Sequence, residues 1–277
     1  MADIARRARI VVTGNCRYRA VYQRKCRQPM ETSDPMMFHP KGPTFWELAV
    51  QALSSTQRGY DLLAPKFDYT PFRTPQLLLD AVGEHLAALG PFDAGLDICC
   101  GTGAAMAVIR RHCRRRVTGI DFSQGMLEVA RQRIADAPGD APLEFVRGDV
   151  LAMPFTAAFD LAVSFGAFGH ILQRDEPRFV AEIARVLRPG GRFVFITTYM
   201  PRLISPHYWF SRLFNAAMRV RNFLIKPEFI MYYLTFLLPQ VETLLRQHGF
   251  EVEVRDMGFK GIWSAARLVI ATRAFSP

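Results

Sequence analysis

Three short segments of the sequence combine glycines with carboxylates in a way that suits the binding of a nucleoside. The first is Leu96-Asp97-Ile98-Cys99-Cys100-Gly101-Thr102-Gly103, whose glycines let a ligand approach the backbone closely. Asp121 follows Gly103 by 18 residues, a distance at which an acidic side chain can bind both hydroxyls of a ribose. Asp149, in Gly148-Asp149-Val150, could accept a hydrogen bond from an exocyclic amine. One glycine turn is weak evidence, but the three segments in this order predict a nucleoside-containing ligand.

The elements that must position these segments alternate between strand and helix. The apolar pattern predicts strands over residues 95–99, 116–120, 143–146, 159–164, 192–198, 250–255 and 267–272. Among the expected helices, one covers residues 46–56, one runs from Ala104 into the basic run 110–116, and one ends at Pro189-Gly190-Gly191. The alternation predicts an α/β fold with a doubly wound parallel sheet. Ligands of such sheets bind beyond the carboxyl ends of the strands, where the three segments lie.

From about Tyr60 to its C-terminus, the sequence resembles the class I S-adenosylmethionine-dependent methyltransferases. It lies closest to the small-molecule group that includes the ubiquinone/menaquinone-biosynthesis C-methyltransferases. Five segments carry the resemblance in the family's order: residues 96–103, 119–127, 148–155, 159–164 and 186–191. The resemblance implies a Rossmann-like, seven-stranded and mostly parallel sheet with an antiparallel edge strand. It also implies an enzyme that uses S-adenosyl-L-methionine as its cofactor.

The resemblance assigns cofactor-binding roles residue by residue. Gly101 and Gly103 would pass the methionine part, and Asp97 would lie near its amino group. Asp121 would bind the ribose, whereas Phe122 and Asp149 would contact the adenine. The complete expected set is Asp97, Cys99, Gly101, Gly103, Asp121, Phe122, Met126, Asp149, Val150, Ser164 and Phe165, with Ser164 and Phe165 near the sulfonium.

One position departs from the family pattern, which usually has glycine where this chain has Cys99. A side chain there would crowd the carboxyl end of the cofactor, although cysteine is small enough to be tolerated. A dinucleotide is a weaker alternative, because Met106 occupies the last glycine position of the G-x-G-x-x-G pattern. No cysteine pair has the spacing of a zinc site, so no metal is expected.

Three residues are candidates for catalysis. Methyl transfer from a sulfonium is a one-step displacement that needs a base only where the nucleophile must lose a proton. His170 is the best-placed candidate base, and its alternative role is to order the loop. Tyr60 and Tyr69 flank a stretch similar to the family segment that closes over the cofactor, and core packing is their alternative. Residues 164–168 lack the Asn/Asp-Pro-Pro-aromatic motif of enzymes that methylate amines of nucleic-acid bases.

The segment of residues 200–240, here called the lid, is longer than an ordinary connection between a strand and a helix. It is rich in aromatic and basic residues, and four prolines are expected to divide it into short helical pieces. In the family that this sequence resembles, an insertion at this place covers the acceptor pocket. An apolar lid suggests a hydrophobic or aromatic acceptor, which could be lipid-like, and peripheral contact with a membrane. The alternatives are a small core within the lid or a dimer contact, and the sequence leaves monomer and homodimer open.

The net charge of +10, from 35 Lys and Arg against 25 Asp and Glu, is unevenly distributed. Residues 1–29 hold eight basic residues and one acidic residue, so they contribute +7 and leave +3 for the rest. We expect residues 1–43 to be a poorly ordered basic arm, of which residues 1–29 precede a second candidate start at Met30. Residues 44–277 would then be the methyltransferase domain, with N-terminal cap helices over 44–92 and the lid over 200–240.

The charge distribution makes a nucleic-acid partner unlikely, since the basic run 110–116 is of the kind that usually forms a solvated face. Two alternatives to a small-molecule methyltransferase stay open. One is an RNA methyltransferase that uses the basic arm, and the other is a catalytically silent cofactor-binding protein of the same fold. Five cysteines without a secretory signal indicate reduced thiols and a cytoplasmic location.

Overall fold

The computed structural model describes residues 39–275. The expected basic arm therefore lies outside the described residues as far as residue 38. Its last five residues, 39–43, are ordered against the domain: the His39 ring stacks on Tyr69 with centroids 4.9 Å apart, and the Gly42 N–H donates to the His39 carbonyl.

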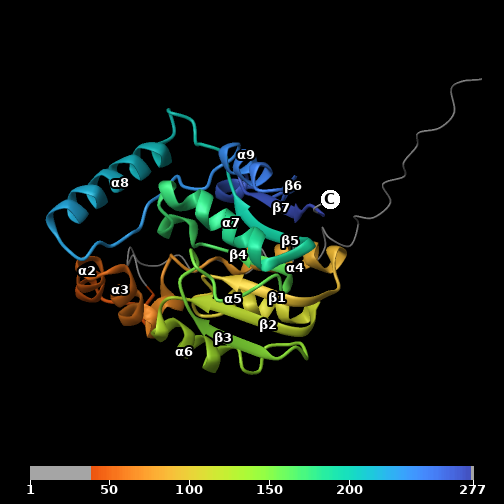
Figure 1. The fold of residues 1–277 in the computed structure, drawn as a ribbon. Coiled ribbons are helices and arrows are strands. Elements are labelled where there is room, and N and C mark those ends of the chain that lie inside the picture. Colours follow the sequence, from red (N-terminus) through yellow and green to blue (C-terminus); the bar gives the residue numbers. More distant parts are fainter. Residues whose placement is uncertain (1–38, 276–277) are drawn as a thin grey trace, which may run out of the picture. The chain divides into compact units, whose positions relative to one another are not determined.

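The centre of the described fold is a seven-stranded sheet in the order β3-β2-β1-β4-β5-β7-β6 (Figure 1). All neighbours pair in parallel except β7, which runs antiparallel to both β5 and β6. The strands are β1 (Phe92–Ile98), β2 (Cys113–Asp121), β3 (Leu143–Arg147), β4 (Phe159–Ser164), β5 (Leu187–Thr197), β6 (Phe250–Asp256) and β7 (Arg267–Arg273). The predicted fold class is confirmed, with the antiparallel pair at one edge and β6 outermost.

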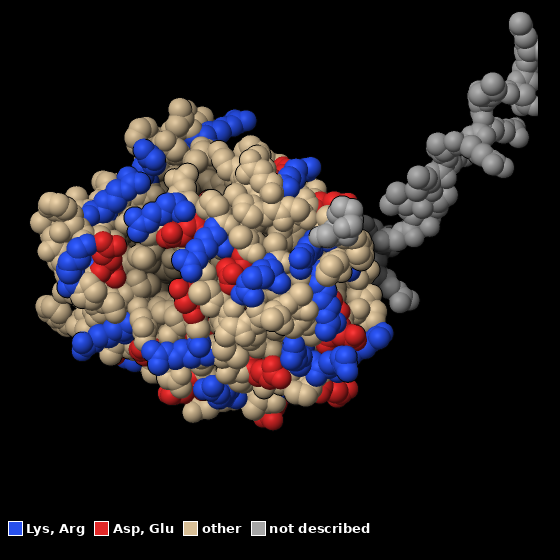
Figure 2. Space-filling model, viewed as in Figure 1, with Lys and Arg blue, Asp and Glu red and all other residues tan. Residues whose placement is uncertain are grey.

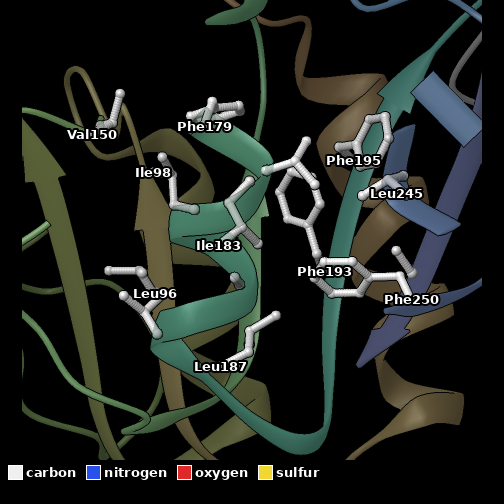
Figure 3. Close-up of a cluster of buried hydrophobic side chains, with 14 of the residues drawn as sticks. Leu96, Ile98, Val150, Phe179, Ile183, Leu187, Phe193, Phe195, Leu245 and Phe250 are labelled. Atoms are coloured by element: carbon white, nitrogen blue, oxygen red, sulfur yellow. The ribbon is translucent and has the colours of Figure 1, made fainter. Parts of the chain in front are cut away.

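Alternate residues of the central strands enter two separate apolar cores, one on each face of the sheet. One core contains side chains of α7 (Glu176–Val186) and α9 (Gln240–Gln247). In Figure 3, Ile183 of α7 lies between Ile98 of β1 and Phe193 of β5. The other core contains side chains of α4 (Gln76–Leu89), α5 (Ala104–Ile109) and α6 (Gln124–Arg133). Helices on both faces leave the carboxyl ends of the parallel strands open for a ligand.

The expected helix over residues 46–56 is two helices, α2 (Phe45–Leu53) and α3 (Thr56–Leu63). The break lies at Ser54 and Ser55, because the Ser55 side chain accepts from the Arg58 N–H and thus caps a new helix. A 3-10 helix, η1 (Ala64–Tyr69), continues α3. The remaining short 3-10 helices are η2 (Arg110–His112), η3 (Phe168–His170), η4 (Gln173–Asp175) and η5 (Gly261–Trp263).

Two expected helix ends are wrong. The basic run 110–116 does not end a helix, since α5 stops at Ile109 and β2 already begins at Cys113. Likewise α7 ends at Val186, and Pro189-Gly190-Gly191 lies within the long strand β5. The register of β5 against β4 shifts between Phe159 and Leu161, and this irregularity accommodates the extra residues that the sequence pattern assigned to a turn.

The lid also differs from its expected series of short helices. It contains one helix of 19 residues, α8 (Pro206–Leu224), followed by an irregular segment that leads to α9. Pro206 lies in the first turn of α8, where proline is tolerated, and the next proline is Pro227, beyond the end of the helix. Of the four prolines, none therefore interrupts the helical stretch.

Candidate active site

The glycine segment forms the turn between β1 and α5, and its two glycines have different roles. Gly101 has φ +49°, and a Cβ on it would meet no atom within 4 Å, so it faces open space. Gly103 has φ +80°, and a Cβ there would lie 3.0 Å from Ile134 of the core. Gly101 therefore leaves room for a ligand, whereas Gly103 allows the start of α5 to pack closely.

Asp121, the last residue of β2, fixes this turn in place. Its Oδ2 accepts from the Gly101 N–H at 2.9 Å and its Oδ1 accepts from the Ser123 N–H at 2.9 Å. Burial raises the pKa of Asp121, while the backbone donors Ser123 and Gly101 act in the opposite direction. The carboxylate thus links the glycine turn to the N-terminus of α6, where Ser123 is the N-cap that the sequence predicts.

Asp97, near the end of β1, is the most unusual ionisable residue of the site. It is 2% exposed, and its Oδ2 has no hydrogen-bond partner among the described residues. Burial raises its pKa well above the usual range, with a smaller contribution from the nearby Asp121. An unpartnered buried carboxylate oxygen is costly, and it suits a ligand that brings a cation or a donor.

These residues line a cavity of about 380 Å³ at the carboxyl ends of β1, β2 and β4. Of the residues expected at the site from sequence, the cavity brings together Tyr60, Asp97, Cys99, Gly101, Asp121, Phe122, Met126, Phe165 and His170. Its wall also includes aromatic residues that sequence reasoning did not assign to the site: Phe67, Phe72, Tyr232 and Tyr233. The lining therefore combines buried carboxylates with a set of aromatic side chains.

Five of the expected site residues do not line this cavity. Tyr69 is exposed and stacks on His39, and Gly103 packs against the core. The Ser164 hydroxyl is fully buried and donates to the Ile98 carbonyl at 2.9 Å, which ties β4 to β1. Asp149 and Val150 follow β3, where the Asp149 carboxylate accepts from the Leu151 N–H at 2.8 Å and the Val150 side chain is buried in the core.

Tyr60 and His170 form a hydrogen-bonded pair in the lining of the cavity. The Tyr60 hydroxyl lies 2.8 Å from Nε2 of His170, and Nδ1 of the same ring lies 2.6 Å from the Ile230 carbonyl oxygen. Because a carbonyl can only accept, Nδ1 carries the proton, and Nε2 of the neutral ring then accepts from the Tyr60 hydroxyl. Burial lowers the pKa of His170 and raises that of Tyr60, so both groups are neutral near pH 7.

Two aspartates that sequence reasoning left without a role attach the cap helices to this site. Asp61 accepts from the Ser123 hydroxyl at 2.6 Å and from the Gly125 N–H at 3.0 Å. Asp68 accepts from the Thr102 hydroxyl at 2.8 Å. Both belong to the stretch between Tyr60 and Tyr69, but their partners are far away in sequence, and no local signal indicates them. These contacts attach the cap segment to the glycine turn and to the start of α6.

The backbone conformation at Cys99 is unusual for a residue other than glycine. Its φ is +58°, in the left-handed region that favours glycine. The family pattern, with glycine there, avoids this strain. The Cys99 side chain lines the cavity, where burial raises the pKa of the thiol.

Comparisons with known proteins agree with this geometry. A family model described as a methyltransferase domain matches residues 96–191. The demethylmenaquinone methyltransferase of Staphylococcus aureus is 32% identical over 187 residues, which cover 62% of this chain and 73% of that protein. The chain belongs to the class I S-adenosylmethionine-dependent methyltransferase family. This methyltransferase therefore uses S-adenosylmethionine as its cofactor.

A second relative and a solved structure resemble the methyltransferase over different lengths. The demethylmenaquinone methyltransferase of Symbiobacterium thermophilum is 32% identical over 168 residues, which cover 60% of this chain and 58% of that protein. An O-methyltransferase family protein from Burkholderia thailandensis aligns with a TM-score of 0.62 at 18% identity, over 84% of this chain and 69% of that chain. At this identity the structural likeness supports the fold alone.

Between residues 39 and 275, no three His, Cys, Asp or Glu side chains form a group that could hold a metal ion. No helix in the same residues is long and apolar enough to cross a membrane.

Proposed function

We propose that this methyltransferase transfers the methyl group of S-adenosylmethionine to a hydrophobic or aromatic small molecule bound in the 380 Å³ cavity. The observation that carries the proposal is a cavity lined both by the buried carboxylates of Asp97 and Asp121 and by aromatic side chains. Two of the relatives are named for a menaquinone precursor, so a quinone-like ring is the first acceptor class to consider. An apolar pocket with a few oriented polar groups is the usual form of a small-molecule site.

Asp97, Gly101 and Asp121 fit the cofactor. The unpartnered Oδ2 of Asp97 would accept from its ammonium group, and the open space at Gly101 would admit its methionine part. Asp121 would bind the ribose hydroxyls, with Phe122 and Met126 against the adenine. Asp149, Val150, Ser164 and Gly103 lie outside the lining of the cavity.

The Tyr60–His170 pair would handle the proton of the acceptor. The bound cofactor supplies an electrophilic methyl carbon, and an acceptor hydroxyl or enol must lose its proton as that carbon is attacked. The phenol oxygen of Tyr60 could accept this proton while the phenol's own proton passes to Nε2 of His170, 2.8 Å away. The Ile230 carbonyl would stabilise the resulting imidazolium through Nδ1–H. Such a role requires the neutral histidine that burial favours.

The test is a transfer assay with methyl-labelled cofactor and a panel of acceptors. The panel contains a reduced naphthoquinone, a simple phenol, a short RNA and a protein-free lipid extract. We expect label in the quinol or lipid fraction. Label in RNA would instead support an RNA methyltransferase, and tight cofactor binding with no labelled product would support a silent binding protein. No feature of the described residues favours either alternative.

A cytoplasmic location belongs to the same proposal. The three described cysteines, Cys99, Cys100 and Cys113, are all free thiols, as a reducing compartment would maintain them.

A further inference from the structure

The helix α8 of the lid is amphipathic in the opposite sense from an ordinary surface helix. Its fully buried residues are all polar, namely Ser211, Asn215 and Asn222, which are at most 8% exposed, and Met218 on the same side is half-buried. The spacing of four and seven residues places all three on one side of the helix. A surface helix normally buries its apolar stripe and exposes its polar one.

The buried asparagines bind the backbone of the irregular segment that follows α8. The Asn215 amide accepts from the Tyr233 N–H and donates to the Tyr233 carbonyl, both at 2.8 Å. The Asn222 amide does the same with Phe229, at 2.9 and 3.1 Å, and donates also to the Tyr232 hydroxyl at 3.1 Å. These contacts fix which face of α8 points inward. They also connect α8 to Tyr232 and Tyr233, which line the cofactor cavity.

The outward face of α8 is apolar over its whole length. Its large side chains are between 59% and 84% exposed, and they are Trp209, Phe210, Leu213, Val220, Phe223 and Leu224. Ala216 and Ala217 are the other residues on this side. An exposed set of this size is more than the scattered apolar residues of an ordinary surface.

Helix α2 adds further exposed apolar side chains beside one end of α8. Its exposed side chains are Phe45, Trp46, Val50 and Leu53, each more than half exposed. Arg221 of α8 donates to the Ala52 carbonyl and to the Ser54 carbonyl, both at 2.8 Å, so the C-terminal ends of the two helices are in contact. Figure 1 shows α2 beside that end of α8. We call the exposed apolar residues of α2 and α8 the α2–α8 face.

All charged residues that α8 contributes to the border of this face are basic. The helix contains Arg212, Arg219 and Arg221 and no acidic residue. Figure 2 shows Lys and Arg side chains along the surface that α8 forms. Arg212 and Arg219 are exposed and have no carboxylate partner among the described residues. An apolar helix face bordered by arginines is the pattern of a helix that lies in the interface of a bilayer.

We propose that the α2–α8 face docks on an anionic lipid surface. The Trp, Phe and Leu side chains would enter the boundary of the acyl chains, and the arginines would contact lipid phosphates. A second copy of the chain fits this face less well, because a symmetric contact through α8 would bring two rows of arginines together with no acid on α8 to pair them. The proposal does not depend on the acceptor, although docking would place the lid and its cavity next to a lipid phase.

Vesicle co-sedimentation of the full-length chain tests the proposal. The vesicles contain phosphatidylcholine alone or with a third of phosphatidylglycerol. We expect binding to the anionic vesicles that weakens with salt. The double variant Leu213→Ser/Phe223→Ser should bind at least about tenfold more weakly, since each substitution removes a large side chain from the buried set. Both side chains are largely exposed, so the fold should be retained, and an unchanged melting temperature checks this.

A matched control substitutes an equally exposed residue elsewhere. Ile262→Ser, in η5 at 87% exposure, should bind vesicles like the wild type. Equal binding by the wild type and the double variant would overturn the proposal and assign any binding to another region, such as the basic arm. Light scattering of the chain in solution gives the second decisive result. A dimer that the double variant converts to a monomer would show that the face is a contact between copies, which also overturns the proposal.

Discussion

Cys99 shows at the residue scale how this methyltransferase departs from its family. It holds a left-handed backbone conformation at the end of β1, with its side chain in the cavity wall. A non-glycine residue in that conformation costs about 1–2 kcal/mol. The strain is therefore borne at the place where the chain approaches the cofactor.

We predict that Cys99→Gly raises the free energy of unfolding by about 0.5–1 kcal/mol, because glycine relieves the strain but has a more flexible unfolded state. Cofactor affinity should be unchanged or higher. Urea denaturation measures the free energy of unfolding, and calorimetry measures the cofactor affinity. Cys100→Gly is the control: it is buried with an ordinary φ, and we expect it to lose stability. Equal losses in the two variants would contradict the account of Cys99.

Asp97 leads to a prediction about pH. Burial raises its pKa in the free protein, and a bound ammonium group would favour the ionised carboxylate and lower that pKa. Cofactor binding should then release a proton, so affinity should rise with pH through the range in which the raised carboxyl group of the free protein titrates. Calorimetry in two buffers of different ionisation enthalpy measures the proton release. Asp97→Asn should bind more weakly and without this dependence. The same pH dependence in the variant would exclude Asp97 as its source.

The Tyr60–His170 pair predicts a difference between turnover and binding. Tyr60→Phe removes the phenol proton donor, and general acid–base groups typically contribute about 10²–10⁴-fold to the rate. We expect kcat to fall at least about 100-fold, with cofactor affinity within about threefold of the wild type. Because burial lowers the pKa of His170, the wild-type kcat at saturating cofactor should be constant near neutral pH and fall only in more acidic solution.

Tyr69→Phe is the matched control, since Tyr69 lies outside the cavity wall. It should leave kcat unchanged. An equal loss in both variants, or full activity of Tyr60→Phe with a hydroxyl acceptor, would contradict the role of the pair.

At the scale of elements, the structure of the lid depends on asparagine side chains. They hydrogen-bond to backbone groups in place of backbone–backbone hydrogen bonds. Asn222→Ala removes the partners of the Phe229 N–H and carbonyl, which lie in a buried segment. Unsatisfied buried groups cost about 1–3 kcal/mol, so we expect a loss of about 2–3 kcal/mol in the free energy of unfolding. Ser211→Ala is the control on the same face. The Ser211 hydroxyl is buried without a partner among the described residues, and its removal should be neutral or stabilising. A neutral Asn222→Ala would contradict this view of the lid.

The sequence predicts the elements of the sheet well and the lid poorly, for a physical reason. Strands buried on both faces have continuous apolar runs, and β4 was predicted from residue 159 to residue 164, as observed. The polar face of α8 is buried and its apolar face exposed, so hydrophobic periodicity does not tell which side packs inward. The asparagines that decide this bind a segment with no regular structure.

The residues of the candidate site were likewise only partly predictable from the sequence. Asp121 was predicted from its place at the end of a strand and Asp97 from the family resemblance, and both line the cavity. Ser164 is also at a strand end, but its hydroxyl satisfies the Ile98 carbonyl inside the sheet. The direction of such a side chain depends on its partners. The pairing of Tyr60 with His170, 110 residues apart, is likewise a product of the tertiary fold.

At the scale of the whole molecule, the excess of positive charge and the proposed active site lie in different parts of the chain. The net charge of +10 arises mainly from residues 1–29, which contribute +7 and lie outside the described residues. The proposed site is instead organised by the carboxylates of Asp97 and Asp121. A basic isoelectric point therefore says little about the reaction of a protein whose cofactor is itself a cation.

The most direct test of the account is the titration of the full-length chain with S-adenosylmethionine by calorimetry, for the wild type and Asp121→Ala. The control is Asp160→Ala, at the start of β4, where the carboxylate accepts from backbone N–H groups far from the cavity wall. We predict measurable binding by the wild type and by Asp160→Ala, and no detectable binding by Asp121→Ala. Equal affinity of Asp121→Ala and the wild type would contradict the assignment of the cofactor site.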